Sequence, residues 1–150
     1  IWCYSGVMTE QAPLHLVIDT NIVLEGLTKQ GSASGLIIEA WLAELFIVYI
    51  STAIAYEYQD VLSRKLSPTR WQTLKPVLGR LLTLTKFTEI HFTWRPISPD
   101  PGDDLIIDCA MNANAAIVTL NLKDFQRAKQ SLGLTVLSPV ELVLKLTGDE

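Results

Sequence analysis

The stretch HLVIDTN at residues 15–21 joins a short apolar run to an abrupt polar end. Its apolar part, LVI, is typical of a strand that is buried on both faces. Asp19 ends the run, at the point where a strand of a parallel sheet presents its side chains to a ligand. The alternative is that Asp19 only caps a turn or a helix, because Asp and the following Thr20 and Asn21 are all good caps.

Segments with strand character and segments with helix character alternate along almost the whole chain. After residues 15–19 we expect strands at 46–50, 86–92, 116–120 and 134–137, and helices at 32–45, 51–66, 68–84, 103–114, 123–132 and 139–146. Ser32 or Ser34 would cap the first of these helices, and Ser51 or Thr52 the second. Pro76 would kink the third helix, and residues 94–102 would form a proline-rich loop. The alternation predicts an α/β fold with a mostly parallel sheet covered on both faces.

The composition indicates one globular domain. Of the 150 residues, 49% are hydrophobic and 19% are charged, which suits a single buried core. The formal net charge of −4 disfavours a protein that coats nucleic acid by bulk charge. Cys3 and Cys109 lie too far apart in sequence to indicate a disulfide scaffold or a zinc cluster, and we expect a reducing, cytoplasmic setting.

The ends of the chain and its apolar stretches give no indication of a membrane protein. A spanning helix needs roughly 20 apolar residues, and charged or amide residues interrupt every long apolar stretch. The first residues lack the basic start and apolar run of a signal peptide. We expect one domain over residues 15–146, preceded by an extension at 1–14 in which Met8 is the natural start.

Basic residues are concentrated in the middle of the chain. Residues 64–95 contain seven Lys or Arg and one acid, whereas the segments on either side are acidic. This pattern is typical of a solvated helical face, and it would also suit a surface that steers phosphates toward an acidic site.

Acidic residues occur at four separated places that the expected fold brings to one edge of the sheet. Besides Asp19, these are Glu57 on an otherwise apolar helix face, Asp104 in the first turn of helix 103–114, and Asp124 beyond strand 116–120. A carboxylate on an apolar face is costly unless it is paired or bound to a metal. Asp103 precedes Asp104, so either could be the third acid.

Two simpler interpretations of these acids stay open. Asp103 could be a helix cap, and Asp108, one turn after Asp104, could be a surface acid or a further metal ligand. Carboxylates four residues apart repel each other unless a positive charge lies between them.

Four carboxylates close together cannot all be ionised unless cations neutralise them. Ligands that are all oxygen favour Mg²⁺ or Mn²⁺, as one ion or two, and such sites commonly act on phosphates. The sequence contains no GxxxxGK[ST], GxGxxG or GxSxG motif that would indicate another chemistry.

Four motifs occur in a characteristic order: LVIDTNIVLEGL, AYEYQDVL, DPGDDLIIDCA and IVTLNLKDF. Together they resemble the PIN domain family over residues 15–140, in particular its branch of toxin components of toxin–antitoxin pairs (the virulence-associated-protein-C type). The resemblance implies a Rossmann-like three-layer α/β/α sandwich and Mg²⁺- or Mn²⁺-dependent endoribonuclease activity. It also implies an RNA substrate, a cognate antitoxin and a homodimer.

The resemblance assigns the catalytic and metal-binding acids to Asp19, Glu57, Asp104 and Asp124. The family position of Asp108 is commonly small or apolar, so this residue is a departure that could add a ligand. We expect polar residues near the acids to orient them, and two basic residues to hold the RNA backbone; these are Thr20, Asn21, Thr119 and Asn121 for orientation, and Arg64 and Lys65 for the backbone.

Two other functions remain as alternatives. A PIN-like fold could serve as a scaffold that binds without catalysis, although all four acids are present. A phosphatase or receiver protein could use Asp19 for phosphotransfer, although Asn21 stands where such phosphatases carry a second Asp.

Overall fold

The computed structural model describes residues 12–93 and 101–148. A five-stranded sheet lies at its centre, in the order β4-β3-β2-β5-β6, and every pair of neighbouring strands is parallel. The strands are β2 (His15–Ile18), β3 (Ile47–Ile50), β4 (Thr85–Phe87), β5 (Ala116–Val118) and β6 (Val136–Leu137). The predicted parallel sheet is therefore confirmed.

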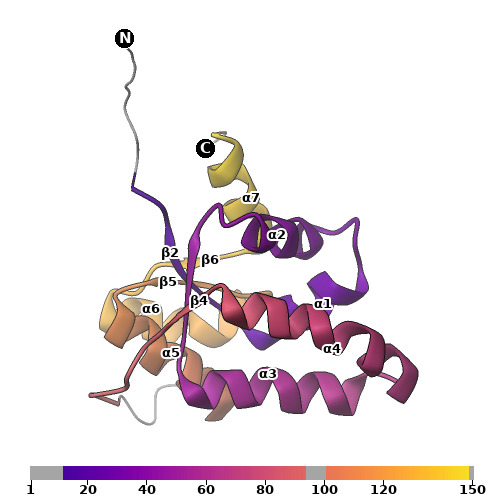
Figure 1. Ribbon diagram of the computed structural model, residues 1–150. Coiled ribbons are helices and arrows are strands. Elements are labelled where there is room, and N and C mark those ends of the chain that lie inside the picture. Colours follow the sequence, from indigo (N-terminus) through magenta and orange to yellow (C-terminus); the bar gives the residue numbers. More distant parts are fainter. Residues whose placement is uncertain (1–11, 94–100, 149–150) are drawn as a thin grey trace.

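Helices cover both faces of the sheet, which makes the three layers expected from the sequence (Figure 1). Figure 1 shows α2 and α7 above the sheet and α3 and α5 below it. The helices are α1 (Thr20–Thr28), α2 (Ala33–Leu42), α3 (Thr52–Lys65), α4 (Pro68–Thr83), α5 (Pro101–Ala113), α6 (Gln126–Leu132) and α7 (Pro139–Thr147), with a 3-10 turn η1 (Leu122–Phe125) before α6. In the described part of the chain, none of these helices has the length and apolar character needed to cross a bilayer.

The chain order of the strands places a switch point beside β2. The chain moves from β2 outward to β3 and β4, then returns to the other side of β2 to form β5 and β6. In open sheets of this kind, ligands bind where the strand order reverses, beyond the carboxyl ends of the strands. Here that point lies between the ends of β2 and β5, at Asp19 and Thr119.

Serine side chains begin several helices. Ser32 accepts a hydrogen bond from the Gly35 N–H at the start of α2, and Ser51 accepts one from the Ile54 N–H at the start of α3. These bonds satisfy N–H groups that have no partner within the helix. They also decide between the alternative caps that the sequence left open.

Several predicted boundaries were wrong. Helix α1 was not predicted, β4 ends at Phe87 instead of residue 92, and α5 begins at Pro101, two residues before the expected start. Residues 101 and 102 of the expected loop therefore belong to α5. The rest of that loop, residues 94–100, lies outside the described residues, and so does the N-terminal segment 1–11. Helix α4 runs through Pro76 without a break, and helix 123–132 divides into η1 and α6.

The close approach of α1 and α2 depends on Gly26. A Cβ atom at this position would lie 2.4 Å from Ile38 Cγ1 and 2.7 Å from the Ser34 carbonyl oxygen. We therefore expect Gly26→Ala to lower the free energy of unfolding by about 1–3 kcal/mol, as measured by urea titration. Gly79→Ala is the matched control, because no atom lies within 4 Å of its Cβ in α4; it should raise stability by up to about 1 kcal/mol. An equal effect of the two substitutions would contradict the packing argument.

Candidate active site

A pocket of about 210 Å³ opens at the switch point of the sheet. Residues from the end of β2, from α1, α3 and α5, and from the segment after β5 line it: Asp19, Thr20, Asn21, Leu24, Glu57, Val61, Lys65, Gly102, Asp103 and Asn121. Three carboxylates from distant parts of the chain thus share this pocket with one lysine and two asparagine amides.

Both carboxylate oxygens of Asp19 accept hydrogen bonds from neighbouring elements. It caps α1, because its Oδ1 accepts a hydrogen bond from the Thr20 N–H at 2.8 Å. Its Oδ2 accepts a bond from the Thr119 hydroxyl at 2.7 Å, and this hydroxyl in turn accepts one from the Asn121 N–H at 3.0 Å. With the carboxylate only 6% exposed, these bonds fix its orientation at the base of the pocket.

Asn21 ties the start of α1 to the segment after β5. Its Oδ1 accepts a hydrogen bond from the Leu120 N–H at 3.3 Å. The four residues expected to orient the acids, Thr20, Asn21, Thr119 and Asn121, therefore contact Asp19, contact one another, or join the two strand ends around it.

Tyr58 supports the strand end from below. Its buried hydroxyl donates a hydrogen bond to the carbonyl oxygen of Ile18, the residue before Asp19. Burial raises the pKa of Tyr58 well above its ordinary value, and the negative charge of Asp19 raises it further. The phenol therefore stays protonated and keeps its donor. Sequence analysis missed this role, for which the one indication was the position of Tyr58 directly after Glu57.

Helix α3 contributes one side of the pocket through residues spaced by four. Glu57, Val61 and Lys65 line it, as this spacing puts them on one stripe of the helix. Arg64 lies outside the stripe and forms an exposed ion pair with Asp60 at 3.1 Å. The structure therefore separates the two basic residues: Lys65 lines the pocket, and Arg64 does not.

The remaining acids differ in their positions. Asp103 lines the pocket from the first turn of α5, whereas the buried Asp104 and Asp108 do not. Asp124 is exposed in η1, three residues beyond Asn121, and is not a lining residue. Of the four acids assigned from the sequence, the structure thus brings Asp19 and Glu57 into one pocket, together with Asp103.

The donors in the pocket suit a hard cation in kind. The charged and polar lining groups are carboxylates, amides, a hydroxyl and one ammonium, with no thiol or imidazole among them, and oxygen ligands of this type favour Mg²⁺ or Mn²⁺. Across residues 12–93 and 101–148, no three His, Cys, Asp or Glu side chains are grouped closely enough to hold one ion together. The donors therefore fit such an ion in chemical type, whereas the described side chains are not gathered around one point.

Comparison with known proteins identifies the family. The model of the PIN domain matches residues 15–123, most of the chain. The chain belongs to the PIN domain family. Members of this family are generally nucleases. A search of curated proteins finds no match to the chain.

Solved PIN-like structures share the fold at low sequence identity. VapBC2 from Rickettsia felis, bound to a DNA fragment from its promoter, is 19% identical with a TM-score of 0.61; the match covers 83% of this chain and 98% of that chain. FitAcB from Neisseria gonorrhoeae is 16% identical with a TM-score of 0.57, over 83% and 98% of the two chains. FitAB bound to the IR36 DNA fragment is 15% identical with a TM-score of 0.56, over 83% and 94%. At these identities the likeness shows the fold.

The core beside the pocket makes stability depend on pH. Burial raises the pKa of the Cys109 thiol to about 12; a hydrogen bond with Thr88 opposes this shift, and the charge of Asp108 adds to it. Since the ordinary value is 9.0, the unfolded chain loses this proton first as the pH rises. The stabilising contribution is therefore complete below pH 9 and is lost progressively between pH 9 and about 12.

We expect the free energy of unfolding to fall by about 1 kcal/mol from this thiol between about pH 8 and 10. Urea titrations at the two pH values would measure the fall, and Cys109→Ala should reduce it. Tyr58 contributes in the same direction at higher pH and remains in both proteins. An equal fall in the wild type and in Cys109→Ala would show that the thiol is not responsible.

Proposed function

We propose that this chain is a divalent-metal-dependent endoribonuclease and the toxin component of a toxin–antitoxin pair. The observation that carries the proposal is the convergence of Asp19, Glu57 and Asp103 in one pocket at the switch point of a PIN fold. The three carboxylates come from the end of β2, from α3 and from α5, which are far apart in the sequence. Their mutual repulsion makes such a pocket unfavourable unless a cation binds there.

Asp19, Glu57 and Asp103 would hold one or two ions, with Asn21 and Asn121 close by. A bound Mg²⁺ or Mn²⁺ would supply Lewis acidity at the phosphodiester and charge neutralisation. Asp124 is assigned by the resemblance, but it is exposed in η1 and does not line the pocket, so we propose a lesser role for it. Asp104 and Asp108, as buried residues outside the pocket, are proposed to support the first turns of α5.

Other residues of this chain would orient the acids and attract the RNA backbone. Thr119 and the Thr20 N–H keep the Asp19 carboxylate in one orientation. The Lys65 ammonium, on the stripe of Glu57, would attract a phosphate oxygen of the RNA, which the acids alone would repel. Hydrolysis at this site should leave a 5′-phosphate and a 3′-hydroxyl.

An antitoxin is the proposed protein partner. The described lining of the pocket has three acids and one base, so a basic side chain from a partner would complement it and block the RNA. The fold is shared with VapBC2 and FitAB, each of which was solved on a DNA fragment. A homodimer is proposed from the family resemblance.

The acids can be tested one at a time on a mixed RNA panel with Mg²⁺, Mn²⁺ or EDTA. We expect Asp19→Asn, Glu57→Gln and Asp103→Asn each to lower kcat/KM by about a hundredfold or more, and EDTA to abolish cleavage. Asp124→Asn should cost less, because its side chain is exposed outside the pocket. Asp104→Asn is the matched control for Asp103→Asn, because Asp104 is the next residue along α5 and does not line the pocket.

A larger loss in Asp104→Asn than in Asp103→Asn, with both proteins folded by circular dichroism, would transfer the third acid to Asp104. Metal-dependent cleavage that survives in both Asp19→Asn and Glu57→Gln would overturn the proposed site. Calorimetric titration of Mn²⁺ gives a second readout, since loss of a ligand should weaken binding of the ion itself.

Lys65 and Arg64 give a matched pair for the role of positive charge. We expect Lys65→Gln to raise KM for RNA by about tenfold, because the lysine lines the pocket, and to leave Mn²⁺ affinity unchanged or higher. Arg64→Gln should have a smaller effect, because the guanidinium is already paired with Asp60. Lys145→Gln on α7, on the opposite face of the sheet, serves as the remote control. Equal effects of all three would indicate only a general loss of charge.

A further inference from the structure

A second and larger pocket, of about 470 Å³, lies where α3 begins and β4 ends. Among the described residues, its lining comes from two segments, residues 51–53 at the start of α3 and residues 87–91 at and after the end of β4. The residues are Ser51, Thr52, Ala53, Phe87, Thr88, Glu89, Ile90 and His91. None of them belongs to the acidic pocket.

Apolar surface is exposed at this pocket. The Phe87 side chain is 62% exposed and Ile90 is 37% exposed. The Phe87 backbone pairs with Ile50 at the end of β3, so its position is fixed by the sheet although its ring is not buried in the core. A fixed and exposed aromatic ring is a suitable surface for stacking, because little freedom is lost when a flat ligand lies on it.

The two pockets lie along the same stripe of α3. Ala53 lines the larger pocket, and Glu57, Val61 and Lys65 line the acidic one. The four residues are spaced by four, so they share one side of the helix. From Ala53 to Glu57 the helix rises about 6 Å. A chain that lies along this stripe with a phosphate at the acidic pocket therefore reaches the larger pocket within a short distance.

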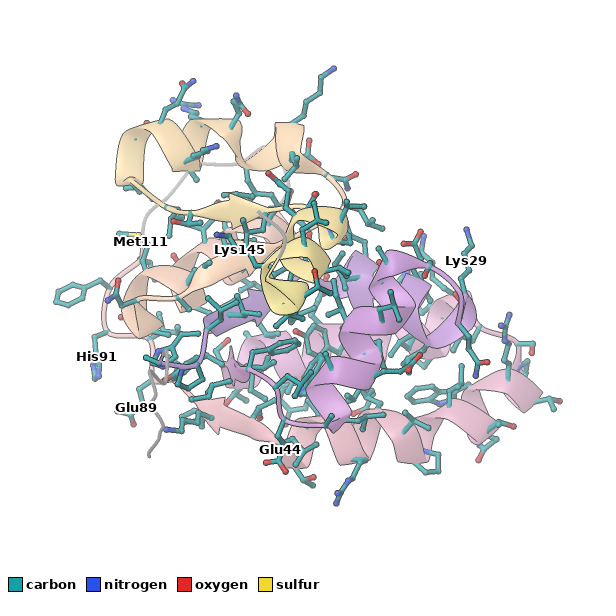
Figure 2. The ribbon with its side chains drawn as sticks, turned by 90° about the horizontal axis from the view of Figure 1, so that it is seen from above. Lys29, Glu44, Glu89, His91, Met111 and Lys145 are labelled. Carbon is teal, nitrogen blue, oxygen red and sulfur yellow. The ribbon has the colours of Figure 1, made fainter. Side chains whose placement is uncertain are left out.

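The chemistry of the larger pocket suits a nucleobase better than a phosphate. Its described lining contains no Lys or Arg, and it includes the carboxylate of Glu89. That carboxylate can accept hydrogen bonds from the amino groups of bases. Figure 2 shows Glu89 and His91 at the margin of the molecule, and their side chains approach to 3.7 Å.

We propose that this pocket binds one base of a single-stranded RNA beside the cleaved phosphodiester, with Phe87 as the stacking surface. The inference rests on the proposed nuclease function and adds a subsite to it. The subsite would let a chain of net negative charge hold RNA through a base, because stacking does not require the phosphate to be attracted. It would also make cleavage depend on the base at one defined position.

The experiment pairs a change in the protein with a change in the RNA. An oligoribonucleotide that the wild type cuts at one bond is made with an abasic residue at each position flanking that bond in turn. We expect one position at which loss of the base lowers kcat/KM about tenfold for the wild type. Phe87→Ala should lose about tenfold on the intact RNA and nothing more on the abasic one, whereas Phe87→Trp should restore the wild-type pattern.

Phe92→Ala is the matched control, since Phe92 is 68% exposed in the same segment but does not line the pocket. It should behave as the wild type does. If the effects of Phe87→Ala and the missing base multiply at every position, or if Phe92→Ala gives the same result as Phe87→Ala, the subsite is overturned.

A second readout separates the subsite from the nuclease function. If the wild type cuts no RNA, the proposed function fails, and binding of fluorescein-labelled oligoribonucleotides in EDTA, followed by anisotropy, then tests the subsite alone. A Kd about tenfold weaker for Phe87→Ala than for the wild type and Phe92→Ala would support it, and equal Kd values would overturn it. If Phe87→Ala changes the mass in light scattering while RNA binding is kept, the surface belongs to a second copy of the chain and the proposal is wrong.

Discussion

The bond between the Thr119 hydroxyl and the Asp19 carboxylate joins residues 100 positions apart in sequence. It fastens the end of β5 to the end of β2, on either side of the switch point. The second oxygen of the same carboxylate caps α1, so one side chain fixes two strands and a helix. The pocket opens at this junction, since Asp19, Thr20 and Asn121 are among its lining residues. The carboxylate that organises the fold locally is also one of those that we propose to hold an ion.

The same arrangement concentrates negative charge, which sets the demands on the rest of the site. Asp19, Glu57 and Asp103 line one small pocket with a single lysine. Ionised carboxylates at this density repel one another until a cation binds, so the free protein is expected to hold them apart, and a bound ion would draw them together. Among the described residues, no three acids are gathered around one point. Lys65 is the one basic residue in the described lining, so it offsets only part of the negative charge of the three acids.

The sequence predicted the sheet well because each strand is a short apolar run. Such runs are typical of parallel sheets, whose strands are buried on both faces. It missed α1 because Asp19 was judged as the end of a strand, although the same residue also caps the helix that follows. It extended β4 to residue 92, where the apolar residues Ile90 and Phe92 follow, but the pairing with β3 ends at Phe87, opposite Ile50. The resemblance assigned Asp104 with a one-residue ambiguity, because Asp103 precedes it, and in the structure Asp103 lines the pocket. Successive helical residues point about 100° apart, so which of two adjacent acids faces the pocket depends on how α5 is rotated against the sheet, and no local sequence pattern fixes that rotation.

The two pockets beside α3 bear on how a protein of net negative charge would select an RNA. With a net charge of −4, the protein gains little from general attraction to phosphate, and weak non-specific binding leaves more of the discrimination to particular contacts. Metal chemistry at an acidic pocket is indifferent to the base attached to the sugar, so it cannot choose where an RNA is cut. The proposed stacking surface in the neighbouring pocket can make that choice, because it acts on the base and not on the backbone. Helix α3 lines both pockets, through Ala53 in one and Glu57 in the other. Their spacing is therefore constant, and a constant spacing is what a preference for one nucleotide beside the cleaved bond requires.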